Sequence, residues 1–240
     1  MQDIWQLLDQ KQSNIMALQI ELAAAVDQYS RLKTSWEANV CQWEWSSSLP
    51  RYELDPLYFF NDSVRRGRPT KKQPRITKGK HQYGFDSLGR IVVEREHTNF
   101  ADRFYERFYT YRESEISAYL YSYDPSKEPI NCSRLELNHG VPTSFHSRAQ
   151  GGSQSHVYIP QKGVVRYFCS LYMPDGREPF GGDGELIFKD GEVIELWHCL
   201  PDGDRKLSFS GSSSLYNSLA GLIAAGANNS FNPMPLRGTG

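Results

Sequence analysis

The stretch Tyr83-Gly84-Phe85-Asp86-Ser87-Leu88-Gly89-Arg90-Ile91 decides the fold expected for the middle of this chain. Two aromatic residues alternate ahead of an Asp-x-x-Gly turn, and an arginine and a run of β-branched residues follow it. Aromatic and β-branched residues favour strands, whereas Asp and Gly favour tight turns. This order predicts an antiparallel hairpin with strands at residues 80–85 and 90–96. The stretch contains no motif for a nucleophile, a metal ion or a phosphate group.

The same alternation of strands and short turns continues through residues 81–210, which we expect to form an antiparallel β-sheet domain. Further strands are predicted at residues 104–111, 116–123, 131–137, 164–173, 184–189 and 192–198. Pro174-Asp175-Gly176, Asp190-Gly191 and Pro201-Asp202-Gly203 separate the later ones, and such turns are strong hairpin signals. Because the connections are short, neighbouring strands pair as an antiparallel β-meander. Residues 138–160, rich in Gly, Ser and His, are instead expected to form a long polar loop.

Residues 1–40 predict a long amphipathic helix, because apolar residues recur at heptad spacing. One series consists of Leu8, Ile15, Leu22, Tyr29 and Trp36, and Ile4, Leu18, Ala25 and Leu32 fill the complementary position. This seam could pack against the rest of its own domain. It could equally form a homodimer or bind a partner helix.

Residues 41–80 are expected to form a linker that is first aromatic and then basic. Pro50 and Pro56 argue against a continuous helix in the aromatic part. Residues 65–80 contain eight Lys and Arg residues and no acidic residue, which is typical of a solvated linker. Residues 211–240 are expected to form a short helix at 215–225 and a tail. The predicted fold class is therefore α+β, with a long N-terminal helix, an antiparallel β-meander sheet and a short C-terminal helix.

Composition places the chain among cytoplasmic proteins without a membrane partner. The formal net charge is −1, so the whole molecule has no strong field toward nucleic acid or anionic lipid. The N-terminus lacks the pattern of a signal peptide, and no apolar run approaches the roughly 20 residues that span a bilayer. The four cysteines are widely spaced and form no Cys-x-x-Cys pair. We therefore expect free thiols, no zinc ribbon and no cofactor.

The Tyr83 hairpin resembles the YD repeat of the RHS family, whose pattern is aromatic-x-aromatic-Asp-x-x-Gly-Arg-Leu/Ile. The matching residues are Tyr83, Phe85, Asp86, Gly89, Arg90 and Ile91. Tyr121-x-Tyr123-Asp124 matches the first half only, since Pro125 departs from the pattern, and Met173-Pro174-Asp175-Gly176-Arg177 keeps the turn alone. Irregular hairpins of this kind resemble the immunity proteins that accompany polymorphic, RHS-type bacterial toxins. The resemblance implies a non-enzymatic protein that binds and neutralises a cognate toxin domain.

Candidate partner-binding residues follow from the excess of aromatic and basic side chains. Such side chains supply much of the binding energy at protein interfaces. The candidates are Trp43, Trp45, Tyr58, Tyr109, Tyr111, Arg66, Arg68, Lys71 and Lys72. The alternative is that the aromatic residues among them pack the faces of the sheet, where cross-strand aromatic pairs are common.

Two other classes of function are considered. Arg66-Gly67-Arg68-Pro69 resembles an AT-hook, in which an extended Arg-Gly-Arg lies in the minor groove of A·T-rich DNA, so the alternative is a DNA-associated protein. A third interpretation is a hydrolase with its site in the 138–160 loop at His146. The spacing of His139, His146 and His156 suits no common zinc pattern, and no GxSxG, HExxH or P-loop motif occurs. A non-enzymatic binding protein therefore remains the favoured interpretation.

Overall fold

A computed structural model describes residues 4–60, 66–70, 72–100, 102–161, 164–172, 180–189, 192–199 and 204–213. The short helix expected at 215–225 and the tail after it lie outside these residues. So do the turns expected at 174–176, 190–191 and 201–203.

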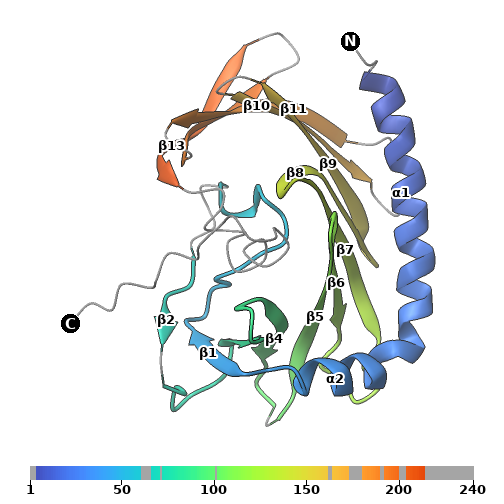
Figure 1. The fold of residues 1–240 in the computed structure, drawn as a ribbon, viewed down its shortest axis with the longest axis vertical. Coiled ribbons are helices and arrows are strands. Elements are labelled where there is room, and N and C mark those ends of the chain that lie inside the picture. The colour runs from blue at the N-terminus through green and yellow to red at the C-terminus, as the bar shows by residue number, and fades with distance from the viewer. Residues whose placement is uncertain are drawn as a thin grey trace.

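Thirteen strands of the described residues form one antiparallel sheet, which confirms the predicted meander. From β3 to β13 the spatial order follows the sequence, and β1 and β2 extend the edge beside β3. The strands are β1 (Gln42–Ser46), β2 (Pro69–Thr70), β3 (His81–Phe85), β4 (Ile91–His97), β5 (Phe104–Arg112), β6 (Glu115–Tyr121), β7 (Pro129–Asn138), β8 (Val141–Ala149), β9 (Gly152–Gln161), β10 (Val164–Tyr172), β11 (Phe180–Lys189), β12 (Glu192–Cys199) and β13 (Arg205–Ser213). The sheet is strongly curved, with a convex and a concave face (Figure 1).

The hairpin that carries the YD-like pattern is formed as expected. The Asp86 carboxylate accepts hydrogen bonds from the backbone N–H groups of Leu88 and Arg90, both at 2.9 Å, and an ion pair at 2.7 Å joins it to the Arg90 guanidinium. Gly89 has φ +75°, in the left-handed region that a residue without Cβ adopts at little cost. Tyr83 is fully buried, so its ring belongs to the core.

The prediction of a long polar loop at residues 138–160 is wrong, because most of these residues form the strands β8 and β9. Their inward side chains include Phe145 and Tyr158, which are buried in the core of the sheet. Their outward side chains are polar but bonded to one another, as in the 2.8 Å contact between His146 Nδ1 and Ser155 Oγ. Since mutual hydrogen bonds satisfy this outer face, the strands lack the apolar alternation by which a buried strand is recognised.

Residues 41–80 also differ from the expected linker. Trp43 and Trp45 lie in β1, and Trp45 pairs with Gln82 of β3. Two backbone hydrogen bonds, from Ser47 N to Arg68 O at 3.0 Å and from Gly67 N to Pro50 O at 2.8 Å, tie the basic segment to the chain beside β1. The segment is therefore part of the sheet domain rather than a connection to it.

The N-terminal helix has two parts, α1 (Ile4–Ala24) and α2 (Tyr29–Glu37), joined by the 3₁₀ turn η1 (Ala25–Gln28). Both cover the convex face, and α2 runs at a steep angle to α1 (Figure 1). α1 lies against β7, β8 and β9, and α2 lies against β4 and β5. No helix among the described residues combines the length and apolar character needed to span a membrane.

The heptad seam faces the sheet of its own chain. Ile15, Leu18, Ala25 and Leu32 are buried, and Leu18 and Ala25 have no exposed surface. Burial of one leucine side chain stabilises a fold by about 1.5–3 kcal/mol. From Ile15 to Leu32 the seam therefore packs against the sheet of its own chain, as the first of the two interpretations has it.

The concave face carries the main core, closed by a segment that we call the strap, residues 47–60. It runs from β1 across the inner side of the sheet and includes the short 3₁₀ helix η2 (Tyr58–Phe60). Leu54 of the strap is 1% exposed and packs among Tyr83, Ile91, Tyr109 and other inward side chains. The middle strands are thus covered on both faces, by helices outside and by the strap inside.

Candidate functional site

A polar pocket of about 240 Å³ lies between the strap and strands β3 to β6. The strap contributes Ser48, Pro50, Glu53 and Tyr58, and the strands contribute His81, Glu94, Glu96, Tyr105, Arg107 and Leu120. Strand alternation explains this lining, because every second residue of β4 and β5 points to the same face of the sheet. The pocket thus combines side chains that are distant in sequence.

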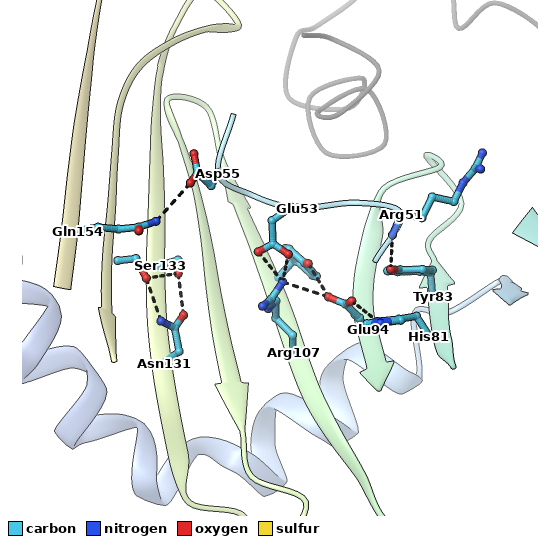
Figure 2. Close-up of polar contacts among 12 residues, drawn as sticks. Arg51, Glu53, Asp55, His81, Tyr83, Glu94, Arg107, Asn131, Ser133 and Gln154 are labelled. Carbon is cyan, nitrogen blue, oxygen red and sulfur yellow. Dashed lines mark hydrogen bonds and ion pairs between the residues drawn. The ribbon is translucent and has the colours of Figure 1, made fainter. Parts of the chain in front are cut away.

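Arg107 joins the strap to the sheet at the centre of this pocket. Its Nη1 lies 2.9 and 2.8 Å from the two carboxylate oxygens of Glu53 and 3.2 Å from Oε2 of Glu94 (Figure 2). Burial alone would lower the pKa of Arg107, but the charges of Glu53 and Glu94 outweigh it and hold the pKa well above its ordinary value. The guanidinium is therefore a fixed positive charge shared by two carboxylates.

The two carboxylates differ in their proton affinity. Burial tends to raise the pKa of Glu94, but Arg107 and a hydrogen bond with His81 Nδ1 at 3.0 Å hold it below its ordinary value. The Tyr109 hydroxyl also donates to Glu94, at 3.1 Å. Burial raises the pKa of Glu53, which Arg107 offsets only in part. Glu94 is thus the better ionised of the pair.

The strap is held to the concave face at two further points. The Tyr83 hydroxyl accepts a hydrogen bond from the backbone N–H of Arg51 at 2.9 Å. At the other end, Asp55 lies 3.2 Å from His156 Nδ1 and accepts a hydrogen bond from Gln154 at 3.3 Å (Figure 2). Together with the Glu53–Arg107 pair, these contacts fix the position of the strap and so the shape of the pocket.

The aromatic candidates are scattered rather than gathered at one surface. Tyr58 lines the pocket. Tyr109 is buried, and the Tyr111 hydroxyl donates to the Ile91 carbonyl at 2.7 Å, so these two tyrosines pack the sheet. Trp43 is 37% exposed, with the Arg95 guanidinium 4.9 Å from its ring, whereas Trp45 is buried.

The basic candidates lie beside the strap. The Arg66 guanidinium stands 4.5 Å from the Phe59 ring, and burial lowers its pKa. Arg68 and Lys72 are exposed, and Lys71 lies outside the described residues. A Cβ on Gly67 would lie 2.1 Å from the Leu49 carbonyl oxygen, so the backbone here is closely packed. To enter a DNA groove as an extended strand, Arg-Gly-Arg would have to leave these contacts.

The three histidines of the expected loop are not brought together. His146 is 1% exposed on the convex face, 3.2 Å from the amide nitrogen of Asn14 in α1, so the helix covers it. His156 lies on the concave face, and His139 is exposed in the turn between β7 and β8. His146 therefore lies in a strand beneath α1 and not in the open loop on which the hydrolase interpretation depended. The described residues contain no group of three or more side chains suited to hold a metal ion.

The central residues of the pocket, Glu53, His81, Glu94 and Arg107, were not among the sequence candidates. One signal was present: Glu94 and Arg107 are opposite each other in neighbouring strands, next to Val93 and Phe108 respectively. Using it requires the register of β4 against β5, which the sequence does not supply. The partner contributed by the strap has no such signal.

No protein-family model, curated protein or solved structure matches this chain.

Proposed function

We propose that this chain is a non-enzymatic binding protein that neutralises a cognate toxin domain of the RHS type. The observation that supports a binding role is the preorganised pocket of the concave face, in which the strap is fixed by Glu53, Asp55 and Arg51. Side chains already held in one conformation lose little entropy when a partner docks, which favours affinity. The YD-like hairpin beside this pocket is what relates the binding role to RHS toxins.

The raised pKa values of three cysteines, Cys132, Cys169 and Cys199, support binding over covalent catalysis by these thiols. A reactive thiol has a lowered pKa, because the thiolate is the nucleophile. Here burial raises the pKa of Cys132 to about 12, and it also raises the pKa of Cys169 and of Cys199. These thiols stay protonated at neutral pH and act as small apolar side chains.

Where a gene for an RHS-type toxin neighbours the gene for this chain, the direct test is neutralisation of its toxin domain. The purified chain and toxin domain should co-elute as a complex in size-exclusion chromatography, and equimolar chain should abolish toxin activity. A toxin domain from an unrelated locus serves as the control and should remain active. Undiminished activity of the neighbouring toxin in the presence of excess chain would refute the proposal.

A further inference from the structure

The pocket under the strap carries an excess of negative charge. Three carboxylates, those of Glu53, Glu94 and Glu96, line it together with one guanidinium, that of Arg107. Arg107 contacts Glu53 and Glu94, whereas Glu96 is exposed at the rim with no ion-pair partner in the described part of the chain. The Lys80 ammonium, 2.9 Å from Ser48 Oγ in the pocket wall, adds a second positive charge, so the three carboxylates exceed the two cations by one and attract an entering positive charge.

His81 holds the Glu94 carboxylate in place in the same pocket. Its ring is 7% exposed, and its Nδ1 contacts the Glu94 carboxylate at 3.0 Å. An ionised carboxylate can only accept, so Nδ1 donates to Glu94 and orients that carboxylate. One wall of the pocket therefore presents an anionic group that is held in a fixed position.

The walls and size of the pocket restrict what can enter. Tyr58 and Tyr105 line it, and tyrosine rings attract cations through their electron-rich faces. Pro50 and Leu120 supply apolar surface for an aliphatic stem. The volume of about 240 Å³ is below the roughly 300–1,000 Å³ of sites for drug-sized ligands, and it suits a single long side chain.

We propose that this pocket receives one arginine side chain of the partner protein. The inference rests on the proposed binding function and specifies which chemistry of the partner is recognised. A guanidinium supplies several N–H donors in a plane, which can meet the carboxylates of Glu96 and Glu53 while its face lies against tyrosine. A lysine ammonium offers the charge without the planar arrangement and should bind more weakly.

The first experiment titrates the full-length chain with N-acetyl-L-arginine amide and follows backbone amide shifts by NMR. Shifts should concentrate in the strap, β3, β4 and β5. N-acetyl-L-citrulline amide has nearly the same shape without the charge and should bind at least about tenfold more weakly, because both the ionic and the cation–π attraction are lost. Equal affinity for the two probes, or no shift with either, would overturn the proposal.

The second experiment compares Glu96→Gln with the control Glu113→Gln, which changes an exposed carboxylate in the turn between β5 and β6. Glu96 is exposed, so its replacement should leave the fold intact. Affinity for the arginine probe should fall about two- to fivefold in Glu96→Gln, as expected for a partly screened charge, and stay unchanged in Glu113→Gln. The same loss in both variants would indicate a general charge effect and contradict the assignment.

A neutralisation assay with the toxin, combined with the probe titrations, distinguishes a failure of this inference from a failure of the proposed function. If the chain neutralises the toxin, and Glu96→Gln slows the association while Glu113→Gln does not, both stand. If neutralisation is normal but the chain binds arginine and citrulline probes alike, the function stands and the pocket assignment fails. If the arginine probe binds selectively but the toxin remains active with excess chain, the pocket stands as an arginine site and the proposed function fails.

Discussion

Arg107 pairs with two largely buried carboxylates at once, those of Glu53 and Glu94. Charges in such a place are stable only as a set, because each would be costly to bury alone. Glu53 comes from the strap and Glu94 from β4, so the same contacts that balance charge also hold the strap against the sheet. Individual side chains here thus determine the shape of the pocket as well as its charge.

The Arg107→Leu variant should lose about 3–5 kcal/mol of unfolding free energy, because two buried carboxylates are left without their partner. Urea denaturation followed by circular dichroism measures this. Arg112→Leu, at the end of the same strand, is the control: this arginine is 76% exposed, and its pair with Glu115 should contribute about 1 kcal/mol or less. Adding Glu53→Gln to Arg107→Leu should restore part of the lost stability; no recovery would contradict the charge argument.

Gly84 is a position where the YD-like hairpin tolerates no side chain. A Cβ there would lie 2.7 Å from Val93 Cγ1 and 2.9 Å from Val40 Cγ2. Gly84→Ala should therefore destabilise the protein by about 1–3 kcal/mol through overpacking, measured by thermal or urea unfolding. Gly151→Ala is the matched control, because no atom lies within 4 Å of its added Cβ, and it should change stability by less than about 0.5 kcal/mol. Similar effects of both changes would show that the close approach at Gly84 does not matter.

The helices and the sheet are joined by polar as well as apolar contacts. Tyr29 of α2 donates a hydrogen bond to Glu106 of β5, and Glu37 pairs with Arg95 of β4. The Tyr121 hydroxyl of β6 donates to the Ala25 carbonyl of η1 at 3.0 Å, at the point where α1 gives way to α2. These contacts satisfy groups that the helices bury against the sheet.

The free energy of unfolding in alkaline solution should depend on the ionisation of the Tyr121 hydroxyl, which donates to the Ala25 carbonyl. Burial, with a smaller effect of the Cys132 thiol, raises the pKa of Tyr121 from 10.0 to about 12. The unfolded chain loses this proton near pH 10 and the folded chain near pH 12, so stability from this group is full below pH 10 and is lost as pH rises to 12. The loss is on the order of 2 kcal/mol.

The Tyr121→Phe variant isolates that effect from the other tyrosines. At pH 8 it should be about 1 kcal/mol less stable than the natural chain, because the hydrogen bond to Ala25 is missing. Between pH 10 and 12 the difference in unfolding free energy should shrink and change sign, since phenylalanine has no proton to lose. Urea denaturation at several pH values measures this. A difference that is independent of pH would contradict the raised pKa.

The sheet is continuous through all thirteen described strands, but the helices and the strap cover only part of it. Strands β4 to β7 lie between the helices on one face and the strap on the other. At the far end, Arg205, Lys206 and Leu207 of β13 are exposed. Local opening requires less energy where few apolar groups are buried, so stability should decline along the sheet toward β13.

Hydrogen–deuterium exchange by mass spectrometry tests this gradient. Amides of β5 and β6 should exchange slowest, and those of β13 should exchange at least about a hundredfold faster at neutral pH, since a difference of about 2.7 kcal/mol in opening free energy corresponds to that factor. Equal protection of β6 and β13 would mean that the sheet opens only as a unit. The Arg107→Leu change should accelerate exchange in the strap and in β4 first.

Sequence patterns determined the N-terminal helix, most of the strands and their antiparallel order, because these depend on local signals. The heptad positions of Leu18 and Leu32, the Asp86-x-x-Gly89 turn and the alternation in β11 and β12 are readable from neighbours a few residues away. The strands β1, β2, β8, β9 and β13 were missed. In β8 and β9, polar side chains bonded to one another occupy the outer face, so the apolar alternation of a buried strand is absent. Helix prediction also missed the bend at η1, where the chain follows the curvature of the sheet.

The tertiary structure alone decided where the pocket is and what lines it. Glu53 meets Arg107 and Glu94 only because the strap crosses the concave face, and no local pattern encodes that crossing. What the heptad seam packs against was likewise decided by the tertiary structure, because the sheet of the same chain buries Leu18 and Ala25. Local spacing sets which residues share a face of an element, whereas long-range packing sets what that face meets. The hairpin at Tyr83 could therefore be read from nine residues, but the neighbouring pocket could not.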